Sequence, residues 1–277
     1  MKKPIKNIPA SMISNSLVKD VSDFLQNYST SLIKISKNSE NGENATLIGT
    51  GTFVSLSGKK GILTAHHVKK ELQLNDSIGL TLVKDVQYIN IPLQHLTLLD
   101  IGIPNVESTG PDLSLITLPD QYYEKIKPYK SFFPLDTERK KILEYLKIDR
   151  EDLWFVYGTI GERTEVENPQ KGFNLVYGYH GFCGMTFIGH SFELDSFDYL
   201  DVIAEFEDLN DLKSYGGFSG GGLWRVLIHL DSQNEIIVKD ILLSGVMFYE
   251  YIRNEERFLR SHGPKSIYHN LFEKFKN

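Results

Sequence analysis

One glycine-rich stretch, residues 215–224 with the sequence Tyr-Gly-Gly-Phe-Ser-Gly-Gly-Gly-Leu-Trp, constrains this chain more than any other. Glycine loses more conformational freedom on ordering than any other residue, so the cluster indicates a backbone geometry that needs it. A serine that attacks a carbonyl must project its Oγ from a tight turn, with backbone N–H groups aimed at the oxyanion. A plain glycine-rich turn between two strands is the alternative interpretation. On this stretch alone both stay open.

Two upstream segments favour the chemical interpretation. Residues 62–68 are mostly apolar and contain His66 and His67, and Asp112 opens the apolar run 113–118. A nucleophilic serine needs a base whose pKa lies near the working pH, and histidine is that base. The histidine in turn needs a carboxylate that fixes its tautomer. The chain offers these residue types in the order His, Asp, Ser.

Four short motifs then resemble the trypsin-like (chymotrypsin-fold) serine proteases. They are Gly-Thr-Gly at 49–51, Thr-Ala-His-His at 64–67, Asp-Leu-Ser-Leu at 112–115 and Gly-Phe-Ser-Gly-Gly at 217–221. The family patterns are Gly-x-Gly, Thr-Ala-x-His, Asp-Leu-x-Leu and Gly-x-Ser-Gly-Gly. Each motif is weak alone, and the four together, in the family's order, carry the resemblance over about residues 32–250.

The resemblance implies a Ser/His/Asp triad. Ser219 is the expected nucleophile, His67 the base and Asp112 the residue that orients the base. The backbone N–H groups of Gly217 and Ser219 are expected to form the oxyanion hole.

Each of two triad positions has a competitor. His67 is preferred to His66 because the base is the fourth residue of the family motif, and strand alternation should place the two rings on opposite faces. His66 is then expected at the surface or behind His67. Asp112 is preferred to Asp100 because a long apolar run follows it. Asp100 leads toward Pro104 and is interpreted as a turn residue.

The resemblance also implies substrate-binding residues. Lys213, with Ser214 and Tyr215 beside it, stands where the family has the floor of its specificity pocket, and a buried ammonium there would favour an acidic substrate side chain. A solvent-exposed Lys213 is the alternative. The strand that pairs with substrate peptide as an added β-strand is expected at the three residues Ser244, Gly245 and Val246.

Phe218 replaces the aspartate that, in the digestive members of the family, pairs with a newly cut N-terminal amine. Activation by N-terminal cleavage is therefore not expected, and an activating partner protein is left open. Tyr215 and Phe218 are further candidates for the pocket lining.

Composition narrows the class of protein. The chain has 277 residues, 24% of them charged, and a net charge of −6, which is ordinary for a globular protein and disfavours nucleic acid and anionic membranes as partners. No run approaches about 18 apolar residues, so no transmembrane helix is expected. Cys183 is the only cysteine, which favours a cytoplasmic location and a structural role for that thiol. No metal or nucleotide motif is present, so no cofactor is expected.

Many short apolar segments between turn signals predict an all-β fold. The resemblance implies that these strands form two six-stranded antiparallel barrels. We expect an N-terminal helical extension at 1–30, a first barrel at 31–119, a linker at 120–150, a second barrel at 151–260 and a C-terminal helix at 261–277. Residues 62–68 are expected to form a strand that presents His67.

The predicted function is that of a serine endopeptidase, which cleaves a polypeptide substrate through an acyl-enzyme intermediate. Specificity for one dedicated protein is one option. A catalytically silent peptide-binding module on the same fold is the main alternative. An α/β-hydrolase-type esterase is a further one, in which Ser219 would be joined by Asp231 or Asp240 and by His262 or His269. That fold needs alternating strands and helices before the serine, which the sequence does not indicate.

Overall fold

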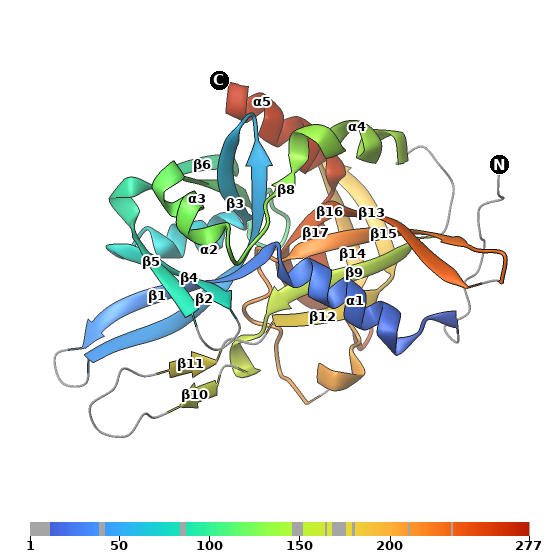
Figure 1. Cartoon of the computed structure of the whole chain (residues 1–277), viewed down its shortest axis with the longest axis horizontal. Helices are drawn as coiled ribbons and strands as arrows, with labels where there is room; N and C mark the ends of the chain where they lie inside the picture. The colour runs from blue at the N-terminus through green and yellow to red at the C-terminus, as the bar shows by residue number, and fades with distance from the viewer. Residues whose placement is uncertain are drawn as a thin grey trace.

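The computed structural model describes residues 12–38, 42–83, 87–145, 152–163, 165–167, 176–178, 181–209, 211–233 and 235–276. Two antiparallel sheets, one from each half of the chain, make up the molecule, and a helical segment joins them (Figure 1). The all-β prediction with two β-barrel halves and additional helices is confirmed at this level. Within these ranges, no helix has the length and apolar character that crossing a membrane requires.

The first sheet has the strand order β5-β4-β1-β2-β3-β7-β6. Its strands are β1 (Ser29–Asn38), β2 (Gly42–Leu56), β3 (Lys59–Thr64), β4 (Ser77–Val83), β5 (Gln87–Pro92), β6 (Thr97–Gly102) and β7 (Leu113–Leu118). A short strand β8 (Phe133–Pro134), from the predicted linker, pairs in parallel with β2. The sheet therefore has more strands than the six that were predicted.

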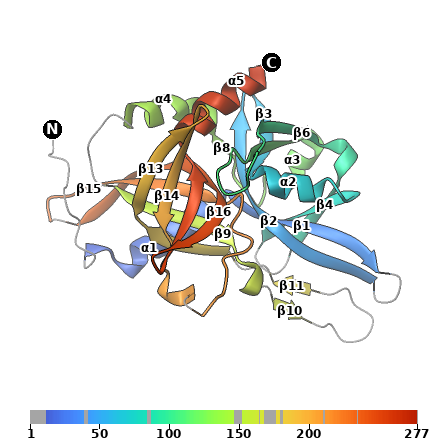
Figure 2. The same cartoon turned by 180° about the vertical axis from the view of Figure 1, so that it is seen from behind.

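The second sheet has the order β12-β9-β15-β16-β17-β14-β13. Its strands are β9 (Leu153–Thr159), β12 (Gly181–Thr186), β13 (Ile188–Leu194), β14 (Phe197–Ile203), β15 (Gly222–Leu230), β16 (Ile236–Arg253) and β17 (Glu256–His262). Figure 2 labels β9 and β13 to β16 among these strands. A separate pair is formed by β10 (Glu165–Glu167) and β11 (Val176–Gly178). The sequence pattern missed β17 because Arg257 and Arg260 interrupt its apolar residues.

Short helices connect and cover the sheets. They are α1 (Asn15–Gln26), α2 (His66–Leu72), η2 (Leu93–His95), α3 (Asp120–Ile126), α4 (Leu135–Tyr145), η3 (Gly161–Arg163), η4 (Glu207–Leu209), η5 (Ser266–Asn270) and α5 (Leu271–Lys276). The Ser14 hydroxyl caps α1 by accepting the N–H of Leu17.

Antiparallel pairing contradicts the α/β-hydrolase alternative. Every named strand pair except β2·β8 is antiparallel, whereas that fold is built on a parallel sheet with crossover helices. The ring of His262 also hydrogen-bonds the backbone of Asp112, so it does not serve Asp231 or Asp240.

The segment that carries His67 corrects one prediction. Strand β3 ends at Thr64, and helix α2 begins at His66, so the two histidines occupy a first helical turn and do not alternate along a strand. Val68 and Leu72 explain the change: they lie four residues apart and are both buried, which is the spacing of one helix face.

Candidate active site

His67 and Asp112 form a tightly coupled pair. The Asp112 carboxylate accepts the Nδ1–H of His67 at 2.6 Å through Oδ2 and the backbone N–H of His67 at 2.9 Å through Oδ1. Asp112 lies just before β7 and is 1% exposed, while the His67 side chain is 39% exposed. Because a carboxylate only accepts, it fixes the proton on Nδ1. This leaves Nε2 of His67 as a free base.

A second histidine–aspartate pair lies one residue earlier on α2. His66 Nδ1 is 2.9 Å from Asp100 Oδ1, and the same oxygen accepts from Ser114 Oγ at 3.1 Å and from Lys69 Nζ at 2.7 Å. Burial opposes ionisation of Asp100, but the hydrogen bonds and charges of Lys69 and His66 outweigh it and hold the pKa of that carboxyl below its usual value.

This second pair corrects one expectation and narrows another. Asp100 lies in β6 and not in a turn. Of the two positions expected for His66, the surface is excluded because the residue is buried. Since Lys69 is almost fully buried and paired with Asp100, the cluster anchors α2 to the first sheet. The His66–Asp100 pair is therefore interpreted as structural.

Ser219 lies against the first sheet, close to α2. Its carbonyl accepts the N–H of Thr50 at 2.8 Å. A Cβ placed on Gly49 would meet this carbonyl at 2.8 Å and the side chain of Val68, which follows His67, at 2.7 Å. The Ser219 Oγ makes a long hydrogen bond of 3.5 Å to the carbonyl of Phe248, and no hydrogen bond joins it to His67 in this structure. Such bonds are often long before substrate binds and shorten in the complex.

The expected oxyanion hole has two unused donors. The Gly216 carbonyl accepts from Gly161 N–H at 2.7 Å, and the Gly217 carbonyl accepts from Thr50 Oγ1 at 2.7 Å. No acceptor within the described ranges takes the backbone N–H of Gly217 or of Ser219. Gly217 has φ +102°, and a Cβ there would lie 2.6 Å from the Thr159 carbonyl, so both its conformation and its surroundings require glycine.

Lys213 does not form a buried pocket floor, because its side chain is exposed. Glu250 stabilises this loop instead. Its Oε2 accepts from Ser214 Oγ and from the N–H of Tyr215, both at 2.8 Å, and its Oε1 is 3.0 Å from Nη1 of Arg257. The expectation that a buried Lys213 ammonium selects acidic substrate side chains is therefore wrong, and the solvent-exposed alternative holds.

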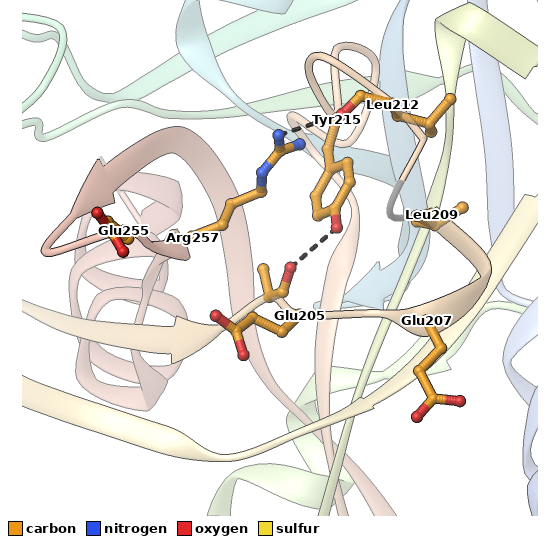
Figure 3. A pocket seen from close by; sticks show the side chains of 8 residues that line it. Glu205, Glu207, Leu209, Leu212, Tyr215, Glu255 and Arg257 are labelled. Atoms are coloured by element: carbon orange, nitrogen blue, oxygen red, sulfur yellow. Dashed lines mark hydrogen bonds between the residues drawn. The ribbon is translucent and has the colours of Figure 1, made fainter.

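Tyr215 and Phe218 belong to the core of the second half. Tyr215 is 4% exposed, donates its hydroxyl to the Ala204 carbonyl at 2.9 Å, and packs under the Arg257 guanidinium at 4.3 Å. Figure 3 shows this ring at the wall of a cavity of about 380 Å³. The cavity is lined by Ala204, Glu205, Glu207, Leu209, Leu212, Tyr215, Glu255 and Arg257. His67, Asp112 and Ser219 are not among its lining residues, so this cavity is separate from the candidate catalytic groups.

The prediction that Ser244, Gly245 and Val246 form a substrate-binding edge is also wrong. Val246 pairs with Gly222 of β15 on one side and with His262 of β17 on the other, and Ser244 is fully buried. No edge is left there for a peptide. The sequence could not fix this register, because three irregularities in the pairing of β16 shift the strand relative to β15 and β17.

The part of β16 beside Ser219, the candidate nucleophile, lies further along the strand. Met247 accepts the N–H of Gly220 at 2.7 Å and donates to the Gly221 carbonyl at 2.9 Å. Strand β15 pairs with β16 only as far as Val246, whereas β17 pairs with it as far as Arg253. Beyond Met247, β16 therefore has β17 on one side and, within the described ranges, no strand on the other.

Comparisons with known proteins return only distant structural matches. No family model and no curated protein matches the chain. Among solved structures, the tobacco vein mottling virus protease aligns with TM-score 0.39 and 10% identity over 94% of this chain and 83% of its own. A chain from work on the coupled folding and binding of the intrinsically disordered Sesbania mosaic virus VPg protein aligns with TM-score 0.42 and 14% identity, over 87% and 89%. TM-scores and identities this low carry no argument about function, so the site assignment depends on the geometry of this chain.

Proposed function

We propose that this protein is a serine endopeptidase that hydrolyses peptide bonds through Ser219, His67 and Asp112. The observation that carries the proposal is the buried Asp112 carboxylate, which binds both the Nδ1–H and the backbone N–H of His67. This arrangement orients an exposed imidazole with Nε2 as its base, on the side of the molecule where Ser219 contacts the first sheet. A binding module has no need of that tautomer.

In this mechanism Ser219 Oγ attacks the scissile carbonyl carbon while His67 Nε2 takes the hydroxyl proton. The N–H groups of Gly217 and Ser219 stabilise the oxyanion. The tetrahedral intermediate collapses to an acyl-enzyme, and His67 gives its proton to the leaving amine. Water, activated by the same imidazole, then releases the acid product. Asp112 stabilises the imidazolium at each stage.

A peptide substrate fits the edge of β16 that begins at Phe248. An extended peptide would add to this edge as a β-strand, and its backbone would reach the Phe248 carbonyl, which is 3.5 Å from Ser219 Oγ. This segment takes the role that the sequence pattern gave to Ser244–Val246. The Glu250 side chain, which bonds Ser214 and Tyr215, would occupy part of the adjoining pocket and favour small substrate side chains there.

Two features bear on activation and location. Phe218 is 1% exposed and packs on Tyr215 and Phe182, so an apolar contact holds the turn where an ion pair would otherwise do so. We therefore propose a site that forms without N-terminal cleavage. Burial raises the pKa of the Cys183 thiol to about 12, which keeps it protonated and supports Ser219 as the nucleophile. A cytoplasmic location, based on this single cysteine, remains part of the proposal.

Labelling with a serine-directed fluorophosphonate tests the proposal. We expect wild-type protein to be labelled on Ser219, and labelling to be lost in Ser219→Ala and in His67→Ala. The matched control is Ser232→Ala, which changes an exposed serine in the turn between β15 and β16 and should label like wild type. Folded wild-type protein that stays unlabelled and cleaves no peptide library would favour the silent binding module. Labelling that appears only after addition of a cell extract would indicate an activating partner.

A further inference from the structure

A buried histidine from a strand that the sequence pattern missed lies directly against the candidate triad. His262 is the last residue of β17 and is 0% exposed. Its Nε2 accepts the backbone N–H of Asp112 at 2.9 Å. The strand register fixes the position of this ring, because His262 pairs with Val246 of β16 and with Tyr199 of β14.

The hydrogen bond determines the state of the ring. Since Nε2 accepts, the ring proton lies on Nδ1, which has no partner within the described ranges. Burial lowers the pKa of His262 to about 4, against the opposing effect of the Asp112 charge and backbone bond. The ring is therefore neutral at pH 7. A protonated ring would point a second N–H at the N–H of Asp112.

The same ring also contacts the nucleophile side of the site. It stacks on Phe248 with a centroid separation of 4.7 Å and an interplanar angle of 26°. The Phe248 carbonyl is the acceptor of the Ser219 hydroxyl. Tyr199 and Phe197 pack on the remaining faces at 5.2 and 5.7 Å. One rigid imidazole thus touches both the residue that carries the triad carboxylate and the residue beside the nucleophile.

We propose that His262 is a positioning residue for the triad. Its neutral ring holds the Asp112 backbone so that the carboxylate reaches both N–H groups of His67, and its face fixes Phe248 beside Ser219. A carboxylate in this place would add a buried negative charge close to Asp112. An apolar side chain would leave the Asp112 N–H buried without an acceptor. This inference rests on the proposed function.

Matched variants test the inference by kinetics. In His262→Gln the side-chain amide oxygen can replace Nε2 as acceptor, whereas His262→Met has similar length and no comparable acceptor. We expect kcat to fall about 10- to 100-fold in His262→Met with KM little changed, and to stay within about threefold of wild type in His262→Gln. Equal losses in the two variants, or no loss in His262→Met, would overturn the positioning role.

NMR gives a second readout that does not require hydrolysis. The ¹H resonance of His67 Nδ1–H reports its hydrogen bond to Asp112, and we expect this signal in wild type and His262→Gln and its loss or displacement in His262→Met. In wild type, ¹⁵N shifts should show His262 with Nδ1 protonated and Nε2 unprotonated at pH 7, which tests the bond even if a variant fails to fold. An Nε2-protonated ring would refute the inference. A protein that gives both expected NMR results but hydrolyses no peptide would contradict the proposed function and leave the positioning of Asp112 by His262 supported.

Discussion

At the scale of single residues, two neighbouring histidines have divergent roles because their aspartates differ in environment. Asp112 is enclosed and binds His67 through two hydrogen bonds, whereas Asp100 is shared among His66, Lys69 and Ser114. Only His67 leaves a substantial part of its ring exposed, at 39% of its side chain against 10% for His66. A base that must meet substrate needs that exposure.

The pairing predicts unequal effects of two matching amide substitutions. Asp112→Asn can turn an amide N–H toward His67, which would favour the wrong tautomer, and we expect kcat to fall by roughly 10⁴-fold. Asp100→Asn should lower kcat less than about tenfold, because its partners anchor α2 only. Steady-state kinetics on a peptide substrate measure both. A larger loss in Asp100→Asn would reverse the assignment of the triad acid.

His262 gives the stability of the fold a pH dependence of definite sign. Burial lowers its pKa from the ordinary 6.5 to about 4 in the folded state, so the unfolded chain binds more protons between these values. The stabilisation is complete above pH 6.5 and is lost as the pH falls toward 4, by up to about 3 kcal/mol. The charge of Asp112 opposes this lowering of the pKa, and Tyr199 is a titratable ring packed on His262.

Urea unfolding at pH 7 and at pH 4.5 measures this effect. The difference between the unfolding free energies at pH 7 and pH 4.5 should be smaller in His262→Gln than in wild type, because the amide does not titrate. Identical pH dependence in the two proteins would show that His262 is not the group responsible.

At the scale of elements, strand β2 connects the nucleophile loop to the first sheet through Thr50. Its hydroxyl donates to the Gly217 carbonyl at 2.7 Å and accepts the N–H of Thr159 at 2.8 Å. Gly217 is thereby fixed from β2, and its neighbour Gly216 from Gly161. The orientation of the Gly217 N–H, one of the proposed oxyanion donors, therefore depends on contacts from both halves of the chain.

Thr50→Val should therefore impair the site. The isosteric change removes both hydrogen bonds, and we expect fluorophosphonate labelling to slow about 10- to 100-fold with a loss of about 1–3 kcal/mol in unfolding free energy. Thr52→Val is the matched control on the same strand, since the Thr52 hydroxyl is buried and has no hydrogen-bond partner among the described residues. That variant should be as stable as wild type or more stable, and equally reactive. Equal effects of the two changes would contradict the role of Thr50.

The loop before Ser219 supports a second prediction at this scale. Lys213 is exposed, so Lys213→Ala should leave the cleavage profile of a peptide library unchanged. Glu250→Gln weakens the bonds to Ser214, Tyr215 and Arg257, and we expect kcat/KM to fall about tenfold through loosening of that loop. A preference for acidic residues that disappears in Lys213→Ala would restore the sequence-based pocket.

At the scale of the molecule, helix α1 joins the two halves. It contacts β1 of the first sheet and β9 and β12 of the second, and it buries Val21 and Leu25. The Ser31 and Thr159 hydroxyls also bond across the halves at 2.8 Å. One continuous apolar core therefore extends from the first sheet into the second.

Removal of buried volume from α1 should destabilise both halves together. Leu25 is 0% exposed, and Leu25→Ala is expected to cost about 2–5 kcal/mol. We predict a single, lower thermal transition by calorimetry, with labelling of Ser219 retained at low temperature. Leu17→Ala, at a partly buried position of the same helix, is the milder control. Two separate transitions would show that the halves unfold independently.

Local patterns in the amino-acid order were enough to predict the β class of the fold and to nominate the residues of the candidate site. Glycines at 217 and 220, a histidine after a buried strand and an aspartate before another are local patterns, and the structure brings His67 to Asp112. Three features could be seen only in the folded chain. Residues 66–72 form the helix α2, the Phe248 carbonyl of β16 lies beside the Ser219 hydroxyl, and His262 accepts the backbone N–H of Asp112. These outcomes depend on strand register and on contacts between residues as far apart as Asp112 and His262, for which local periodicity carries no information.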